Sequence, residues 1–117
     1  MSKRDVRLYL HDMLSAISKV ERFTAGLDYE RFESNEMVID AVVRNLEVIG
    51  EAARNIPPDL RARYTEIEWH RIIGFRNIAI HAYFVVDLQI VWTIATKGLH
   101  QLRRALLSML EELGEDS

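Results

Sequence analysis

The sequence predicts an all-α fold, an antiparallel bundle of four to five helices in a single domain spanning residues 1–117. Apolar residues recur every three or four positions along most of the chain, which is the period of an amphipathic helix. The two prolines are adjacent, and no alternating valine- or threonine-rich segment is long enough for a strand. Long helices with short connections pack as antiparallel neighbours.

The first helix is expected from about Lys3 to Phe23. Its buried stripe consists of residues three or four apart: Val6, Leu10, Met13, Ile17 and Val20. Gly26 and Asp28 mark the turn that follows it. The pattern of residues 29–34 is ambiguous between a loop and one helical turn.

The second long helix is expected from about Asn35 to Asn55. Its apolar side is formed by Val38, Val42, Leu46, Ile49 and Ala53. Pro57 stops this helix, and Pro58 suits the first turn of a short third helix that runs to about Tyr64.

A fourth helix is expected over about 69–83, and a fifth from Asp87, a candidate N-cap, to about Leu113. The apolar line of the fifth helix is Leu88, Val91, Ala95, Leu99, Leu102, Leu106, Met109 and Leu113. Gly98 in mid-helix costs roughly 1 kcal/mol relative to alanine, so we expect a close helix crossing or a kink there. Gly114 ends the helix.

Composition excludes several classes of protein. The chain has 117 residues, of which 49% are apolar, enough for one hydrophobic core. The absence of cysteine excludes a disulfide framework, a thiolate metal site and a cysteine nucleophile. The first twenty residues carry charges throughout, and no segment approaches the roughly 18 consecutive apolar residues of a membrane helix. We therefore expect a cytoplasmic protein.

The net charge of −3 argues against a protein that coats nucleic acid non-specifically. Arginines nevertheless cluster within residues 54–76, namely Arg54, Arg61, Arg63, Arg71 and Arg76. Such a local basic patch could hold RNA phosphates. Ordinary solvated arginines on helix surfaces are an equally good interpretation of Arg61 and Arg63 taken singly.

The stretch 76–83 carries the candidate site. Arg76, Asn77, His81 and Tyr83 fall within about two helical turns of an otherwise apolar segment. An arginine supplies a permanent cation with a fork of donors that suits phosphate. A histidine can move a proton near neutral pH. The pair indicates phosphodiester chemistry without a metal.

These four polar side chains share one arc of the expected helix, and Ile73 and Ile80 lie within the same arc. A polar face interrupted by two isoleucines suits contact with another subunit, so we expect a homodimer with a cleft at the seam. A lone histidine at such a contact is more often a packing residue, but packing alone has no need of an arginine and a histidine together. Asn77 could instead brace a turn.

The spacing of arginine, histidine and tyrosine in this stretch resembles the signature of the HEPN superfamily, specifically its HepT-like ribonuclease toxins. The resemblance extends to residues 44–52, to Trp69 through Gly74 and to Asp87 through Trp92. In matching order and spacing it covers roughly Asn35 to Leu106. It implies a HEPN-like bundle that acts as a dimer.

The resemblance also implies a function: a metal-independent endoribonuclease, the toxin of a HepT/MNT-type toxin–antitoxin system, with RNA as substrate. Arg76 and His81 would be the nuclease residues, and Asn77 would assist them. Tyr83 would be the residue to which a cognate minimal nucleotidyltransferase antitoxin attaches AMP. No cofactor and no metal are implied.

Two other functions remain open. A non-catalytic nucleotide- or substrate-binding subunit of a nucleotidyltransferase could use the same polar arc to grip a phosphate. A purely structural helical adaptor is the third possibility, and the polar motif disfavours it. A ribonuclease assay separates the enzyme from the binding module.

Other polar residues give weaker signals. Asn45 lies near the edge of an apolar face, where it could reach the cleft or brace two helices. Glu47 and Glu51 could mimic a carboxylate metal site, but helix-surface ion pairs with neighbouring arginines are the better interpretation. The remaining histidines lack metal-ligand spacing: His11, His70 and His100.

Overall fold

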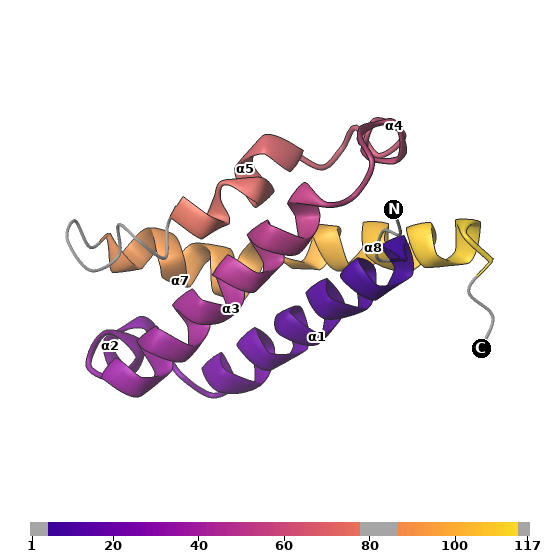
Figure 1. The fold of residues 1–117 in the computed structure, drawn as a ribbon. Helices are drawn as coiled ribbons and strands as arrows, with labels where there is room; N and C mark the ends of the chain where they lie inside the picture. Colours follow the sequence, from indigo (N-terminus) through magenta and orange to yellow (C-terminus); the bar gives the residue numbers. More distant parts are fainter. Residues whose placement is uncertain (1–4, 78–86, 115–117) are drawn as a thin grey trace.

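A computed structural model of the chain describes residues 5–77 and 87–114. Within these ranges it contains seven helices and no strand. The chain runs back and forth along the molecule through α1 (Val6–Thr24), α3 (Glu36–Arg54), α5 (Trp69–Ile73) and the pair α7 (Leu88–Lys97) and α8 (His100–Glu112) (Figure 1). The expected all-α antiparallel bundle is confirmed.

An aspartate caps the start of α1. The carboxylate of Asp5 accepts a hydrogen bond of 2.9 Å from the backbone N–H of Arg7 and another of 2.7 Å from its guanidinium. These hydrogen bonds from Arg7 lower the pKa of Asp5 to about 2. Along the helix, Val6 is half-buried, and the rest of the expected stripe is fully buried: Leu10, Met13, Ile17 and Val20.

α3 is the central helix, and it lies between α1 and α5 (Figure 1). Asn35 is its N-cap, and the side-chain oxygen accepts a hydrogen bond of 3.1 Å from the backbone N–H of Val38. The expected apolar side faces the core and includes the buried residues Val42, Leu46, Ile49 and Ala53. Full burial of one leucine or isoleucine contributes about 1.5–3 kcal/mol, so this side of α3 stabilises the bundle strongly.

Two short helices connect the long ones. The ambiguous segment after α1 forms α2 (Tyr29–Glu33), capped by Asp28, whose carboxylate accepts a 2.9 Å hydrogen bond from the backbone N–H of Arg31. The indole ring of Trp92 in α7 packs on α2, with its centroid 5.0 Å from that of Phe32. α4 (Pro58–Arg61) follows α3 and ends before the expected limit near Tyr64.

The prediction of one long helix from Asp87 to about Leu113 is wrong, because α7 and α8 are separate helices. Asp87 is the expected N-cap of α7, and Gly98 ends it, donating its N–H to the carbonyl oxygens of Thr93 and Ile94 at 3.2 and 3.0 Å. A Cβ atom at position 98 would lie 3.1 Å from the Cα and carbonyl oxygen of Ile94. A side chain would crowd this point, where α7 ends and the bend at Gly98 and Leu99 leads into α8.

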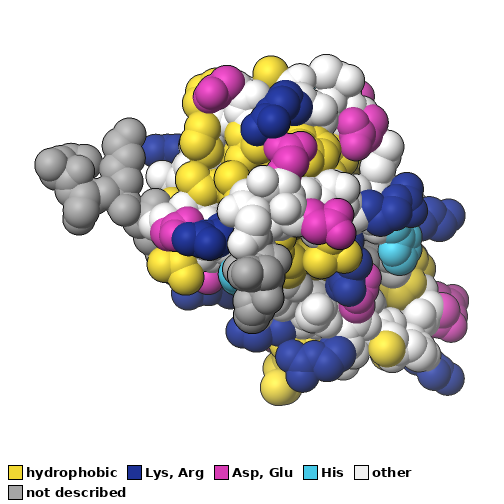
Figure 2. Space-filling view, turned by 90° about the vertical axis from the view of Figure 1, so that its right-hand side faces the viewer, with side chains coloured by type: hydrophobic (Ala, Val, Ile, Leu, Met, Phe, Trp, Pro, Cys, Tyr) yellow, Lys and Arg dark blue, Asp and Glu magenta, His cyan; other side chains and the backbone are white. Residues whose placement is uncertain are grey.

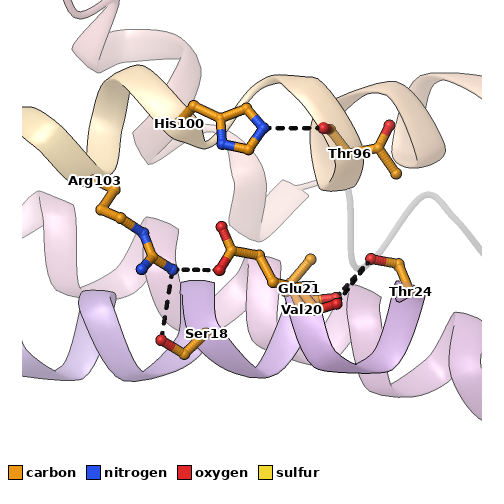
Figure 3. A network of polar contacts seen from close by, with 7 residues as sticks. All are labelled: Ser18, Val20, Glu21, Thr24, Thr96, His100 and Arg103. Atoms are coloured by element: carbon orange, nitrogen blue, oxygen red, sulfur yellow. Dashed lines mark hydrogen bonds and ion pairs between the residues drawn. The ribbon is translucent and has the colours of Figure 1, made fainter. Parts of the chain in front are cut away.

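A polar contact ties α8 to α1 (Figure 3). The guanidinium of Arg103 donates to the carboxylate of Glu21 and lies 3.5 Å from the hydroxyl of Ser18. Across the junction between α7 and α8, the ring Nε2 of His100 lies 3.3 Å from the carbonyl oxygen of Thr96. The two side chains of the Arg103–Glu21 pair are about one-third exposed, at 33% and 37%. The pair fixes α8 along α1.

The surface carries both signs of charge. At the end of the molecule where α1 begins and α8 ends, Lys and Arg side chains are interspersed with Asp and Glu (Figure 2). Among the helices in the described ranges, none combines the length and the apolar character needed to cross a membrane.

Candidate active site

Gly74 interrupts the helix expected over about 69–83. As the C-cap of α5, it donates its N–H to the carbonyl oxygen of His70 at 3.0 Å. Residues 75–77 are helical again, and the N–H of Asn77 donates to the carbonyl oxygen of Gly74 at 2.9 Å. The expectation of one continuous helix is therefore wrong, because a turn separates α5 from the residues that begin the motif.

The expected division of faces holds over most of this segment. Ile72 and Phe75 are buried in the core, while Asn77 is exposed and Arg76 is half-buried. Ile73 is half-buried and packs in part against the core, so only part of its side chain is exposed.

Gly50 allows this turn to rest directly on α3. A Cβ atom at position 50 would lie 2.9 Å from the backbone nitrogen of Arg76 and 2.9 Å from the carbonyl oxygen of Ile73. A side chain there would force the backbone to move. Glycine therefore sets how closely the two segments approach, and that approach places Arg76 beside the C-terminal part of α3.

Glu51 is the carboxylate that this approach brings to Arg76. Nη2 of Arg76 lies 3.3 Å from Oε2 of Glu51. The other oxygen, Oε1, lies 3.8 Å from Nη1 of Arg54, one turn further along α3. The side chain of Arg76 is 40% exposed and that of Glu51 is 49% exposed. A ligand in solvent can therefore reach the guanidinium without any rearrangement of the core.

The structure describes two of the four predicted site residues. Arg76 and Asn77 are consecutive helical residues that follow the turn at Gly74, and the side chain of Asn77 is exposed. His81 and Tyr83 lie outside the described residues, as does Ile80. Their assigned roles remain predictions from the sequence.

The arginines between residues 54 and 76 do not form an unopposed basic patch. Each has an acidic or carbonyl partner: Arg54 and Arg76 with Glu51, Arg61 with the carbonyl oxygen of Ile56, Arg63 with Glu112 and Arg71 with Glu68. Arg61 and Arg63 are ordinary surface arginines. An RNA phosphate would have to share an arginine with an existing partner.

The other polar residues of α3 have local roles. The side-chain amide of Asn45 donates to the carbonyl oxygen of Ala41 in the same helix at 2.8 Å, so this bond braces α3 alone. The expected helix-surface ion pair between Glu51 and Arg54 is confirmed. Glu47 and Glu51 also line a groove of 410 Å³ between α1 and α3. Across 5–77 and 87–114, no three His, Cys, Asp or Glu side chains gather into a metal-binding group.

Sequence reasoning missed the contact between Glu51 and Arg76. It treated Glu51 as a residue of the α3 surface, which is correct for its pairing with Arg54. The available signal was Gly50, because a glycine in mid-helix costs about 1 kcal/mol relative to alanine and indicates a close approach of another backbone. Gly50 predicts that another part of the backbone lies close to α3, but it does not predict which segment that is.

Comparisons with known proteins give consistent results. The family model described as Ribonuclease HepT-like matches residues 13–109. "Putative RNase MJ1380" of Methanocaldococcus jannaschii is 40% identical over 104 residues, covering 89% of this chain and 95% of that protein. "Putative RNase MJ0125" of the same organism is 38% identical over 115 residues, covering 98% and 99%.

A further relative comes from another organism. "Probable ribonuclease HepT" of Thermococcus cleftensis is 38% identical over 101 residues, covering 86% of this chain and 92% of that protein. A search of the solved structures found no match. The family match spans Gly50, Glu51, Arg76 and Asn77 together with the segment that holds His81 and Tyr83. The chain therefore belongs to the ribonuclease HepT-like family, and the expected enzyme class, ribonuclease, is confirmed.

Proposed function

We propose that this ribonuclease is a metal-independent endoribonuclease and the toxin of a HepT/MNT-type toxin–antitoxin system. The observation that carries the proposal is the placement of half-buried Arg76 and exposed Asn77 just after the turn at Gly74, where the backbone lies against α3 within a segment that matches the ribonuclease family. A guanidinium that is 40% exposed suits the binding of a phosphodiester.

The chemistry needs a proton acceptor, a proton donor and stabilisation of charge on phosphorus. His81 would accept the proton of the RNA 2′-hydroxyl or supply the proton that the leaving 5′-oxygen takes up. The 2′-oxygen forms a bond to phosphorus as the bond to the 5′-oxygen breaks, which leaves a 2′,3′-cyclic phosphate and a free 5′-hydroxyl. Arg76 would hold the phosphate, and Asn77 would orient the phosphate or His81. DNA has no 2′-hydroxyl and should not be cut.

The test is cleavage of single-stranded RNA by purified protein in EDTA. Arg76→Ala and His81→Ala should each remove most activity, because general acid–base catalysis is worth about 10²–10⁴-fold. Matched controls are Arg71→Ala and His70→Ala, which remove the same side-chain types from exposed positions of α5. A strict requirement for a metal, or a loss below about tenfold in His81→Ala, would contradict the proposal.

The second part of the proposal concerns Tyr83. A cognate minimal nucleotidyltransferase would join the phenol oxygen of Tyr83 to the α-phosphorus of ATP, displacing pyrophosphate and releasing the phenol proton. The added phosphodiester would compete with RNA for Arg76 through charge-assisted hydrogen bonds. Modification would therefore block cleavage.

The proposed modification of Tyr83 is tested by measuring the intact mass of the protein after incubation with ATP, magnesium and the cognate nucleotidyltransferase. Mass increments of AMP should appear in the native protein and vanish in Tyr83→Phe, while Tyr29→Phe should still be modified. Ribonuclease activity should fall only in the modified protein. A modified protein that cuts RNA at the full rate would exclude this regulation, and RNA binding without cleavage would favour the binding subunit.

A further inference from the structure

Arg76 does not meet solvent as an isolated cation, because a carboxylate from another helix holds one edge of its guanidinium. The Nη2–Oε2 separation from Glu51 is 3.3 Å, and the two side chains are 40% and 49% exposed. A guanidinium has five N–H donors in a planar fork. Among residues 5–77 and 87–114 the guanidinium is paired only through Nη2, which leaves its other N–H groups available for a phosphate.

The carboxylate is itself held from two sides. Its Oε2 atom faces Arg76, and its Oε1 atom lies 3.8 Å from Nη1 of Arg54. Arg54 stands one turn along the same helix, so α3 supplies both the carboxylate and the cation that restrains it. The three side chains carry a net charge of +1, which still attracts a phosphate.

The backbone beneath this pair is also constrained. A Cβ atom built at Gly50 would lie only 2.9 Å from the backbone nitrogen of Arg76. The backbone at residue 76 is therefore packed directly against Gly50, the neighbour of Glu51. The N–H of Asn77 is bonded to the carbonyl oxygen of Gly74 at 2.9 Å. With the backbone fixed on both sides of Arg76, the direction of its long side chain is the remaining freedom, and Glu51 restricts it.

We propose that Glu51 is a positioning residue, which orients the guanidinium of Arg76 so that its free edge meets the scissile phosphate. The proposal rests on the proposed role of Arg76 in RNA cleavage. A flexible arginine side chain loses conformational entropy when it is ordered on a substrate. Glu51 orders it beforehand, and a misplacement of about 1 Å at a reacting centre can cost about 10²-fold in rate.

The pair makes little difference to stability, so the variants that test it should fold. Ion pairs between exposed side chains contribute about 0–1 kcal/mol. Glu51→Gln keeps the size of the side chain and an oxygen that can accept from Arg76, whereas Glu51→Ala removes both. Far-ultraviolet circular dichroism and thermal unfolding of both variants should match the native protein closely.

The experiment measures kcat for RNA cleavage and, separately, the Kd for a non-cleavable 2′-deoxy oligonucleotide of the same sequence. Glu51→Ala should lower kcat about tenfold, and Glu51→Gln should recover part of that loss. The Kd should change less than kcat, because the entropy lost in ordering Arg76 on the oligonucleotide is offset by removal of a carboxylate that opposed Arg54 and Arg76. A merely structural role would instead change both quantities together.

Glu68→Gln is the matched control. Glu68 pairs with Arg71 at 3.2 Å on an exposed part of α5, so this variant removes the same charge and a similar surface ion pair. It should leave kcat within about twofold of the native value. An equal loss of kcat in Glu68→Gln and Glu51→Gln would overturn the proposal. An increase of kcat in Glu51→Ala would also overturn it, because Glu51 would then compete with RNA for Arg76.

A double-mutant cycle separates this inference from the function on which it rests. If Glu51 acts through Arg76, then Glu51→Ala should cause no further loss in the Arg76→Ala background. If Arg76→Ala is fully active, the proposed site itself is wrong. If Arg76→Ala is inactive while Glu51→Ala keeps the native kcat, the site stands and only the positioning role of Glu51 fails.

Discussion

The hydroxyl of Tyr64 links the loop before α5 to the C-terminal end of α8. It donates to Oε2 of Glu112 at 2.8 Å, and Nη1 of Arg63 lies 2.9 Å from the other oxygen of the same carboxylate. The indole N–H of Trp69, the first residue of α5, donates to the carbonyl oxygen of Tyr64 at 3.2 Å. These bonds hold the start of α5 against the C-terminal turn of α8.

Tyr64→Phe should lower the free energy of unfolding at pH 7 by about 0.5–1.5 kcal/mol, the usual net worth of one hydrogen bond. Burial, and then the hydrogen bond to Glu112, raise the pKa of Tyr64 above its ordinary value. A raised folded-state pKa means that this contribution is complete below about pH 10 and is lost as the pH rises further. Urea unfolding of both proteins from pH 7 to pH 11 should show the difference shrinking above pH 10.

The control for this measurement is Tyr29→Phe. Tyr29 is half-buried beside Trp92, with ring centroids 6.4 Å apart in an edge-on arrangement. Tyr29→Phe should change the free energy of unfolding at pH 7 by less than Tyr64→Phe does. A Tyr64→Phe protein as stable as the native one would show that the bond to Glu112 contributes nothing.

At the scale of elements, the contact between α3 and the turn at Gly74 determines where Arg76 stands. α3 and α5 pack against each other over much of the length of α5. Gly50 is the point of closest approach, since a Cβ there would meet the backbone of residues 72, 73 and 76 at 2.9–3.1 Å. Local helix propensity alone would favour alanine at this position by about 1 kcal/mol.

Gly50→Ala should therefore destabilise the protein by about 1–3 kcal/mol, the usual cost of overpacking, instead of stabilising it. The added methyl group would push the Arg76 turn away from α3, so we expect RNA cleavage to fall at least tenfold at a temperature where the variant remains folded. Thermal unfolding and the EDTA cleavage assay measure the two effects. A more stable and fully active Gly50→Ala protein would show that the close approach has no consequence.

At the scale of the whole molecule, we propose that the protein is a homodimer with the motif at the subunit seam. Of the two apolar side chains that suggested this interface, Ile73 is half-buried against the core and keeps some exposed surface, and Ile80 lies outside the described residues. A twofold axis near the motif would bring two copies of Arg76 close together.

Sedimentation at micromolar concentration should give a dimer for the native protein. Ile80→Glu should shift it to a monomer and lower RNA cleavage, because a buried charge at an interface is costly. The control is Leu107→Glu, which places the same charge on α8 at a side chain that is 51% exposed. A monomeric native protein with full ribonuclease activity would contradict the proposal.

The sequence by itself determined the helical elements and the family of this protein. Apolar spacing along α1 and α3 predicts the buried residues because neighbours at i+3 and i+4 lie on one face of a helix, and Leu10, Leu46 and Ile49 are fully buried as expected. The cap at Asp87 could also be predicted, since a cap bonds to a backbone N–H only three residues away. The spacing of Arg76, His81 and Tyr83 indicated the ribonuclease class that the comparisons confirm.

Only the tertiary structure decided the helix ends at Gly74 and Gly98 and the pairing of Glu51 with Arg76. A mid-helix glycine in a periodic pattern fits a kink, a close crossing or a helix end equally well, and the structure shows that α5 and α7 end at these glycines. Glu51 and Arg76 lie on different elements, so their separation depends on how α3 and the turn after α5 approach each other. A local periodicity carries no information about that approach, because it describes neighbours within one helix.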